Sequence, residues 1–168
     1  IPATVTHDGK TYQVTAIDYT AFEDCTSLTS LSIPASVTVI GHRCVQGCTQ
    51  LSNINVDSNN PWYTAKQGVV VAENSYFSEL IAYPAGKTST FFRVPAGVTS
   101  IPPSFFRDNT YLQRVELPSS VVVVDLLAFR GCMALTTNVT ENVSPRAIED
   151  LAFDEETYAH ATLIVPVG

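Results

Sequence analysis

A 23-residue internal repeat is the strongest constraint on how this chain folds. Residues 14–34 read VTAIDYTAFEDCTSLTSLSIP and residues 37–57 read VTVIGHRCVQGCTQLSNINVD, so the second copy begins 23 residues after the first. The pattern returns at residues 98–118 and continues at Val121 and Leu135, and a partial copy follows at Ile148 and Phe153. A unit this short cannot bury its apolar face alone, so the copies must stack into a solenoid.

Within one unit, the order of residue types predicts two short extended pieces joined by turns. Leu31-x-Ile33 alternates apolar and polar residues like a strand with one buried face, and Pro34 ends it. Val37-x-x-Ile40 predicts a second extended piece, and Tyr19 to Asp24 predicts a turn of helix or 3₁₀ structure that directs an aromatic side chain inward. Three phenylalanines are expected to fill equivalent core positions: Phe22, Phe106 and Phe129.

These motifs resemble a known family. The leucine-rich repeat core L-x-x-L-x-L is matched by Leu28-x-x-Leu31-x-Ile33, Leu51-x-x-Ile54-x-Val56 and Leu112-x-x-Val115-x-Leu117. Pro118, Val121, Ala128-Phe129, Gly131-Cys132 and Leu135 also follow the pattern of the BspA-like subfamily of bacterial surface proteins. The resemblance implies an α/β solenoid, strand-rich, with a right-handed stack of short parallel strands. Two departures are Val45, where the family has Phe, and Asn109, where it has Cys.

The spacing of the copies predicts a single leucine-rich repeat solenoid domain over residues 1–168. Between Val37 and Val98 the step is longer than two periods, which indicates an insertion. The predicted units are repeats at 14–36, 37–57, 98–120, 121–142 and 143–168, and a long, hairpin-bearing repeat at 58–97.

The long repeat is the candidate binding region that stands out by its aromatic content. Gly68 to Ala72 and Glu79 to Tyr83 are β-prone runs, and we expect them to form a hairpin. Aromatic side chains are enriched at binding hot spots, but they also close hydrophobic cores, so both interpretations stay open. The aromatic residues here are Trp62, Tyr63, Tyr76, Phe77, Tyr83, Phe91 and Phe92.

Charge and hydropathy exclude several classes of partner. The chain has a net charge of −7, and its lysines are Lys10, Lys66 and Lys87, which argues against nucleic acid and anionic membranes as ligands. No run approaches the roughly 18 apolar residues that a membrane span needs, so we expect no membrane insertion in this chain. The BspA-like resemblance implies an extracellular or cell-surface location, and we expect any signal or anchor to lie outside this chain.

The cysteines and histidines indicate packing rather than chemistry. Cys25, Cys48 and Cys132 share one phase of the repeat, and we expect them, with Cys44, to be buried free thiols. A disulfide between Cys25 and Cys48 is marginal, because Cβ atoms on adjacent rungs are about 4.8 Å apart. No catalytic motif and no metal-ligand spacing is present, so the expectation is a protein that is not an enzyme and has no cofactor or metal.

The outward strand positions suggest how such a module binds. A row of polar, mostly uncharged side chains suits hydrogen-bonded recognition of a protein or a glycan. The resemblance implies adhesion to extracellular matrix or to other bacterial cells; the alternative is a spacer or stalk domain with no ligand of its own. The oligomeric state is left open. The candidate ligand-binding residues are Trp62, Tyr63, Tyr76, Phe77, Ser30, Ser32, Asn53, Asn55, Arg114 and Glu116.

Overall fold

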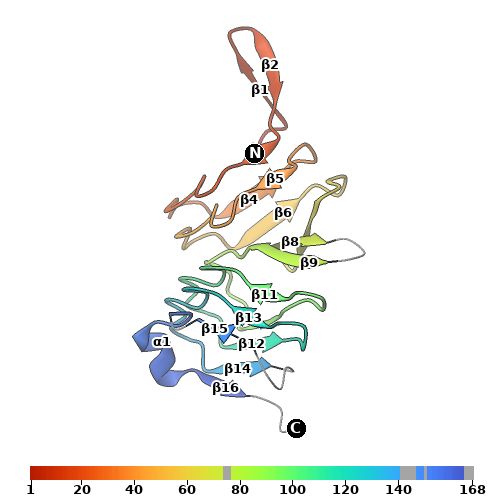
Figure 1. Ribbon diagram of the computed structural model, residues 1–168. Coiled ribbons are helices and arrows are strands. Elements are labelled where there is room, and N and C mark those ends of the chain that lie inside the picture. Colours follow the sequence, from red (N-terminus) through yellow and green to blue (C-terminus); the bar gives the residue numbers. More distant parts are fainter. Residues whose placement is uncertain (74–76, 141–146, 150, 165–168) are drawn as a thin grey trace.

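The chain folds into one elongated stack of short strands, shown in Figure 1. The computed structural model describes residues 1–73, 77–140, 147–149 and 151–164. The N-terminal hairpin and β16 (Thr162–Ile164), the last described strand, lie at opposite ends of the stack. We call each copy of the repeat a layer: the first, second, long, third, fourth and fifth layers follow the predicted units in chain order.

The Leu-x-Ile segments form parallel strands, as their alternation predicts. Ser30 lies opposite Asn53, and Leu31 and Ile33 are buried while Ser30 and Ser32 are exposed. These strands make two sheets, which we call the leucine ladders: β4 (Ser30–Ile33) with β6 (Asn53–Val56), and β10 (Phe91–Arg93), β12 (Arg114–Leu117), β14 (Thr137–Thr140) and β16 (Thr162–Ile164) in that order.

The V-x-x-I segments form a second set of parallel pairs, and the strand occupies the last two residues of each predicted piece. Ile17, Ile40 and Ile101 are buried there, which anchors this side of each layer to the core. The strands are β3 (Ala16–Ile17) with β5 (Val39–Ile40), and β11 (Ser100–Ile101), β13 (Val123–Val124) and β15 (Ala147–Ile148) in that order.

The segment predicted as a turn of helix is a series of hydrogen-bonded turns instead. Thr20 and Asp24 have φ of 57° and 56°, which a right-handed helix does not allow. We call this region the turn segment of a layer. The stack contains four of them among the described residues: 18–24, 41–47, 102–108 and 125–131.

The long layer interrupts both sets of parallel strands with an antiparallel sheet. β8 (Val69–Glu73) and β9 (Ser78–Ala82) form the hairpin predicted from the sequence, within one residue at either end. β7 (Tyr63–Lys66), which the sequence analysis missed, pairs with the other edge of β8. The turn between β7 and β8 is made by Gln67 and Gly68, both with positive φ.

A second hairpin, also missed, projects from the N-terminal end of the stack (Figure 1). β1 (Thr4–His7) and β2 (Lys10–Gln13) pair through a turn at Asp8 and Gly9. The Asp-Gly dipeptide is a strong hairpin signal, and it was available in the sequence. Every residue of both strands is exposed, so this hairpin adds nothing to the core.

The core divides into two clusters at the long layer. In β8, Val70 packs with the first and second layers, whereas Val69 and Val71 pack with the third to fifth. The first cluster is aliphatic with Cys44 and Cys48, and the second contains the stacked rings of Phe106 and Phe129. Phe106 and Phe129 fill core positions as predicted, but Phe22 is only partly buried.

Three of the four cysteines are buried free thiols, as expected. Cys25 is exposed, so the prediction was wrong for this residue: it lies in the first layer, where no described layer covers it. Burial, and then the charge of Cys48, raises the pKa of the Cys44 thiol to about 12. Burial also raises the pKa of Cys132. Such thiols stay protonated and inert at neutral pH.

One short helix closes the described part of the stack, so the α component of the fold is small. α1 (Glu155–His160) begins after Asp154, whose carboxylate accepts a hydrogen bond from the Thr157 N–H. The acidic run Asp154-Glu155-Glu156 therefore forms an N-cap and first turn. Among the described residues, no helix is both long and apolar enough to cross a membrane.

Candidate ligand-binding surface

The first leucine ladder presents a neutral hydrogen-bonding surface. Register brings Ser30 beside Asn53 and Ser32 beside Asn55, so the four predicted residues of this ladder lie together. Three of them are exposed and Asn53 is half-buried. The Asn53 amide donates to the Asn55 side-chain oxygen at 2.8 Å, so the two asparagines hold each other in place.

The second leucine ladder carries a charged cluster around Glu116. Arg93 Nη2 lies 2.5 Å from Glu116 Oε2, and Arg114 Nη2 lies 2.6 Å from Glu116 Oε1. Arg93 Nε also donates to Oε2 at 2.7 Å. The sequence analysis named Arg114 and Glu116 but missed Arg93, which occupies the position paired with Glu116 one strand earlier.

Two guanidinium groups on one carboxylate leave one positive charge uncompensated. Partial desolvation raises the pKa of Glu116, but hydrogen bonds and charges from Arg93 and Arg114 outweigh it and hold the pKa below its usual value. Glu116 therefore stays ionised and fixes the direction of both arginines. The free N–H groups of planar guanidiniums suit carboxylate and other oxygen-rich ligands.

A hollow of about 430 Å³ lies over this cluster. Phe91 is exposed at its edge and pairs in register with Arg114, so an apolar ring and a cation stand side by side. The residues that line it are Thr90, Phe91, Gln113, Arg114 and Glu116. With Arg93 added, we call them the arginine patch. Phe91 was identified only as part of the aromatic group, yet its 23-residue step to Arg114 could have placed it here.

The two ladders are not one continuous face. β8 and β9 lie between β6 of the first ladder and β12 of the second, as Figure 1 shows. The predicted residues that the structure describes therefore separate into a neutral group on the first ladder, the arginine patch on the second, and the aromatic group of the long layer.

The structure gives the aromatic group of the long layer mixed roles. Trp62 is 58% exposed and Phe77 is 49% exposed, so both are accessible. The Tyr63 hydroxyl accepts a hydrogen bond from the Ile40 N–H at 3.1 Å and lies 3.4 Å from the Thr38 carbonyl, and burial raises its pKa. This placement favours a structural role for Tyr63, whose hydroxyl continues the ladder of β5. Tyr76 lies outside the described residues.

The described residues offer no cluster of three or more His, Cys, Asp or Glu side chains that could hold a metal ion. The prediction of a protein without metal or enzymatic chemistry stays a prediction.

Solved structures of similar proteins share this fold. A leucine rich cell surface protein from Faecalibacterium prausnitzii A2-165 has a TM-score of 0.71 and 29% identity over 86% of this chain and 43% of that one. A leucine-rich repeat protein from Bacteroides ovatus ATCC 8483 has a TM-score of 0.58 and 26% identity over 99% of this chain and 44% of its own.

The pneumococcal vaccine antigen PcpA, with a TM-score of 0.67 at 19% identity over 80% of this chain and 38% of its own, supports the fold alone. The chain thus spans less than half the length of each of these proteins. Comparison with curated proteins gives no match.

The family comparison agrees with the layers seen in the structure. The family described as "BspA type Leucine rich repeat region" matches residues 10–66 and 85–164 in six copies, which is more than half of the chain. The matched residues include both leucine ladders, and most of the antiparallel hairpin lies in the gap between the two ranges. The chain therefore belongs to the BspA-type leucine-rich repeat family.

Proposed function

We propose that this chain is a non-enzymatic protein-interaction module of a bacterial surface protein, and that it binds an extracellular protein or glycan through the arginine patch. The observation that carries the proposal is the Arg93–Glu116–Arg114 network beside exposed Phe91. Arginines and aromatic rings dominate binding hot spots, and here both arginines are already oriented. The cell-surface relative from Faecalibacterium prausnitzii supports the location.

The patch favours a ligand that carries a carboxylate. The chain as a whole has a charge of −7, so most acidic ligands are repelled at long range. The uncompensated charge of the arginine patch is a local exception, because Glu116 neutralises only one of the two arginines. Binding should therefore weaken as salt rises.

The test is biolayer interferometry of the chain against immobilised extracellular matrix proteins and a set of acidic and neutral glycans. The patch variant is Phe91→Ala/Arg93→Ala/Arg114→Ala. The control variant, Ser30→Ala/Ser32→Ala/Asn55→Ala, removes the same number of exposed side chains from the other ladder. Circular dichroism confirms that both fold.

We expect the patch variant to lose at least about tenfold in affinity, which corresponds to one hot-spot residue, while the control stays within about twofold. Loss in the control but not in the patch variant would move the site to the first ladder. Absence of binding to any ligand would support the alternative function, a spacer that presents other parts of its parent protein.

A further inference from the structure

The long layer lacks one piece of main chain that the layers on either side possess. The second and third layers each have a turn segment, at 41–47 and 102–108. In the long layer, β9 ends at Ala82, and the chain passes directly through Tyr83 to the segment 84–87. The stack is therefore interrupted on this side.

The interruption is one layer wide. The Gly86 N–H donates to the Leu51 carbonyl of the second layer at 2.8 Å. From the third layer, the Asn109 side chain donates to the carbonyls of Ala85 and Lys87 at 2.8 and 2.9 Å. The segment 84–87 is thus the single layer between them. Where the turn segment is missing, the flanking chains stand two rung spacings apart, roughly 9.5 Å.

Successive turn segments elsewhere are joined by a regular ladder of main-chain hydrogen bonds. Phe22 and Asp24 donate to the carbonyls of Cys44 and Gln46. Between the third and fourth layers the same ladder has three bonds: Ser104 to Leu126, Phe106 to Ala128 and Asp108 to Arg130, at 3.1, 2.8 and 2.8 Å. Alternate residues donate, as along the edge of a parallel strand.

The missing turn segment leaves both halves of such a ladder open. On the second layer, three N–H groups that correspond to the ladder donors of the third layer have no main-chain acceptor among the described residues. On the third layer, three carbonyls that correspond to the ladder acceptors of the fourth layer have no main-chain donor among those residues. The donors are Arg43, Val45 and Gly47, and the acceptors are Pro103, Phe105 and Arg107. Val45, Gly47 and Phe105 are buried residues, whereas Pro103 is exposed and Arg43 and Arg107 are half-buried. Main-chain groups without a ladder partner are a template for pairing with another chain.

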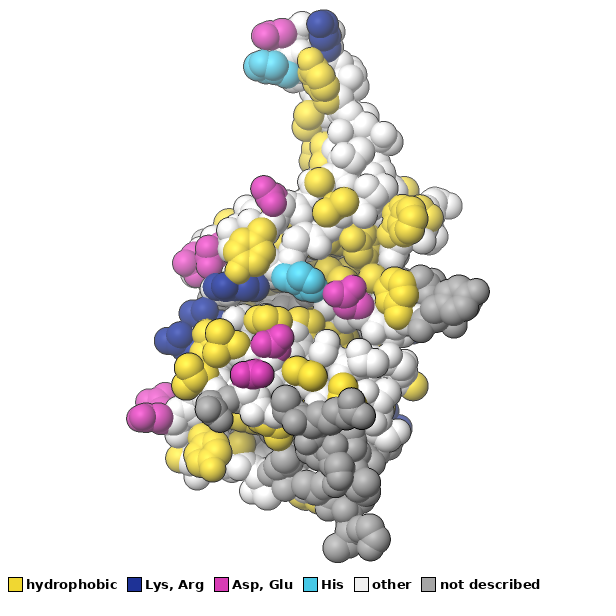
Figure 2. All heavy atoms as spheres, viewed as in Figure 1, with side chains coloured by type: hydrophobic (Ala, Val, Ile, Leu, Met, Phe, Trp, Pro, Cys, Tyr) yellow, Lys and Arg dark blue, Asp and Glu magenta, His cyan; other side chains and the backbone are white. Residues whose placement is uncertain are grey.

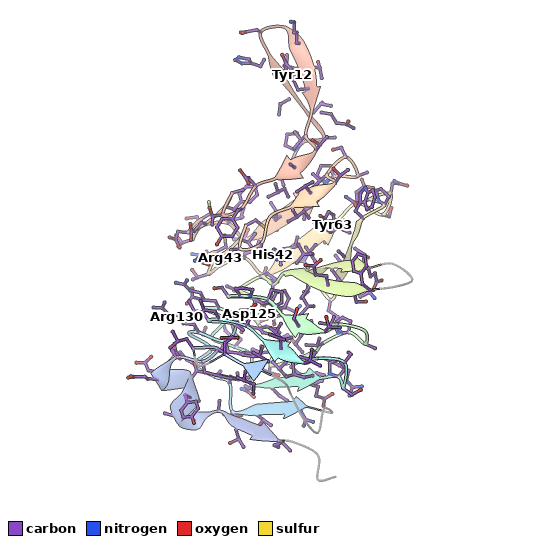
Figure 3. All side chains as sticks on the ribbon, in the orientation of Figure 1. Tyr12, His42, Arg43, Tyr63, Asp125 and Arg130 are labelled. Carbon is purple, nitrogen blue, oxygen red and sulfur yellow. The ribbon has the colours of Figure 1, made fainter. Side chains whose placement is uncertain are left out.

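Arg43, Val45, Pro103 and Phe105 line a notch, and Gly47 and Arg107 lie outside its lining. We define the notch by its lining residues: 42, 43, 45 and 46 on one wall, 102–105 on the other, and 81–83 at the floor. Figure 2 shows charged side chains along the upper edge of this hollow, and Figure 3 labels His42 and Arg43 there, with Asp125 and Arg130 farther along the stack. The Arg43 guanidinium donates to Tyr19, and Gln46 donates to Glu23, so both side chains point toward the first layer.

The floor of the notch is already filled by an aromatic ring. Tyr83 packs against Phe105 and Phe106, with ring centroids 5.8 and 4.9 Å away. It is 4% exposed, and its hydroxyl has no hydrogen-bond partner among the described residues. The enclosed part of the notch measures about 20 Å³, room for little more than one water molecule.

We propose that the notch binds an extended peptide segment of a partner protein, which enters as the missing layer. The segment accepts hydrogen bonds from Arg43, Val45 and Gly47 and donates to Pro103, Phe105 and Arg107. Recognition is through neutral main-chain groups, so it tolerates salt, unlike the arginine patch. Because Tyr83 fills the core position and the enclosed volume is small, the inward residue of the peptide is Gly, Ala or Ser. This site is separate from the arginine patch and does not depend on it.

The probe is a phage library of unconstrained heptapeptides, panned against the immobilised chain in about 0.5 M NaCl to suppress charge-driven binding. Enriched peptides are synthesised with blocked ends and titrated into the wild type and two variants. Pro103→Trp places a large side chain at the notch. Leu126→Trp is the matched control, because Leu126 lies one repeat further on and lines no part of the notch.

Amide hydrogen exchange reads out the register. In the free protein we expect the Val45 N–H to exchange at least about 100-fold faster than its ladder-bonded equivalent at Phe106. Bound peptide should slow the exchange of the Arg43, Val45 and Gly47 amides. The affinity of the peptide should fall at least about tenfold for Pro103→Trp, and it should stay within about twofold of the wild type for Leu126→Trp.

Three results would overturn the proposal: no enriched peptide, equal binding to both tryptophan variants, or peptide binding that leaves the three amides unchanged. Loss of matrix or glycan binding in the arginine-patch variant does not bear on any of these three results, so the two proposals are tested independently.

Discussion

The two core clusters use the same repeat but fill its aromatic position differently. In the third to fifth layers, Phe106, Phe129 and the partly buried Phe153 form a stack with centroids 4.9 and 5.0 Å apart. In the first two layers, the same position holds Phe22, which is partly buried, and Val45, which is buried but has no ring. The difference teaches that the motif sets which way a side chain points, whereas its neighbours along the stack set how much surface it buries.

Thiol labelling gives the largest contrast between the first layer and the second cluster. Cys25 and Cys132 share one repeat phase, but Cys25 is exposed and Cys132 is fully buried. We expect a maleimide to label Cys25 immediately, and Cys132 at least about a thousandfold more slowly, because its access requires unfolding. Peptide mapping by mass spectrometry measures both rates. Similar rates would show that the second cluster opens locally.

Truncation of the stacked phenylalanines should cause the largest loss of stability. Phe129→Ala should lower the free energy of unfolding by about 3 to 5 kcal/mol, since it leaves a cavity between two stacked rings. Phe22→Ala should cost less than half as much, because Phe22 is only partly buried. Urea unfolding followed by circular dichroism measures both. Equal losses would mean that the first layer is covered in solution.

Asn109 joins the long layer to the third layer, where the repeat motif has Cys. Its amide donates to Ala85 and Lys87, and its side-chain oxygen accepts from the N–H groups of Tyr111 and Leu112. Asn109→Ala should cost about 3 kcal/mol, since buried main-chain groups lose their partners.

Asn109→Cys is the matched control. The Cys132 thiol, at the same phase, donates to the Phe106 carbonyl, 26 residues earlier. The equivalent acceptor for a cysteine at 109 is the Tyr83 carbonyl, so Asn109→Cys gains one bond that alanine lacks and should cost less than alanine. If alanine and cysteine cost the same, the hydrogen bonds of Asn109 contribute little. Thermal unfolding of the three proteins decides.

The smallest effect concerns the cap of the last described layer. Desolvation raises the pKa of Asp154, but hydrogen bonds from Thr157 and Gly131, with the charge of Arg130, lower it overall from 3.8. A carboxylate whose folded-state pKa is lowered stabilises the folded protein at pH values above its unfolded-state pKa. This stability is lost as the pH falls through the folded-state pKa. Asp154→Ala should cost about 1 kcal/mol at pH 7 and less at pH 3.

Urea unfolding at the two pH values measures this difference. Glu156→Ala, on an exposed position of the same helix, is the control and should change little. A cost for Asp154→Ala that is independent of pH would assign the effect to packing rather than to the carboxylate.

Much of the fold could be predicted because the same pattern of apolar and polar residues recurs in each copy of the repeat. The strands at Leu31 and Val115, and the hairpin of β8 and β9, follow from alternation and spacing. β7 was missed because Tyr63 to Lys66 is only four residues long and contains Ala and Lys, which are depleted in strands, and because its pairing depends on β8. The right-handed sense of the stack stays a prediction.

The candidate site was predictable only in part. Arg114 and Glu116 were identified as outward residues, but their network with Arg93 requires the exact register between β10 and β12. The interpretation of Tyr63, which the sequence left open between binding and packing, became structural, because its hydroxyl accepts a hydrogen bond from the Ile40 N–H of β5. The 23-residue step alone could have paired Arg93 with Glu116, but which side chains of neighbouring layers bond to one another is visible only in the structure.

The sequence by itself determined the repeat, the direction of its apolar side chains and the family, because a fixed 23-residue step imposes the same layer each time. Only the tertiary structure decided where that stack is broken. The long layer supplies a core aromatic residue, Tyr83, without the turn segment that normally accompanies one. Among the described residues, the Val45 N–H and the Phe105 carbonyl therefore have no main-chain partner across the notch. The physical reason is that each main-chain hydrogen bond between layers needs a partner that is distant in the sequence, and the residue type at one position does not show whether that partner is present.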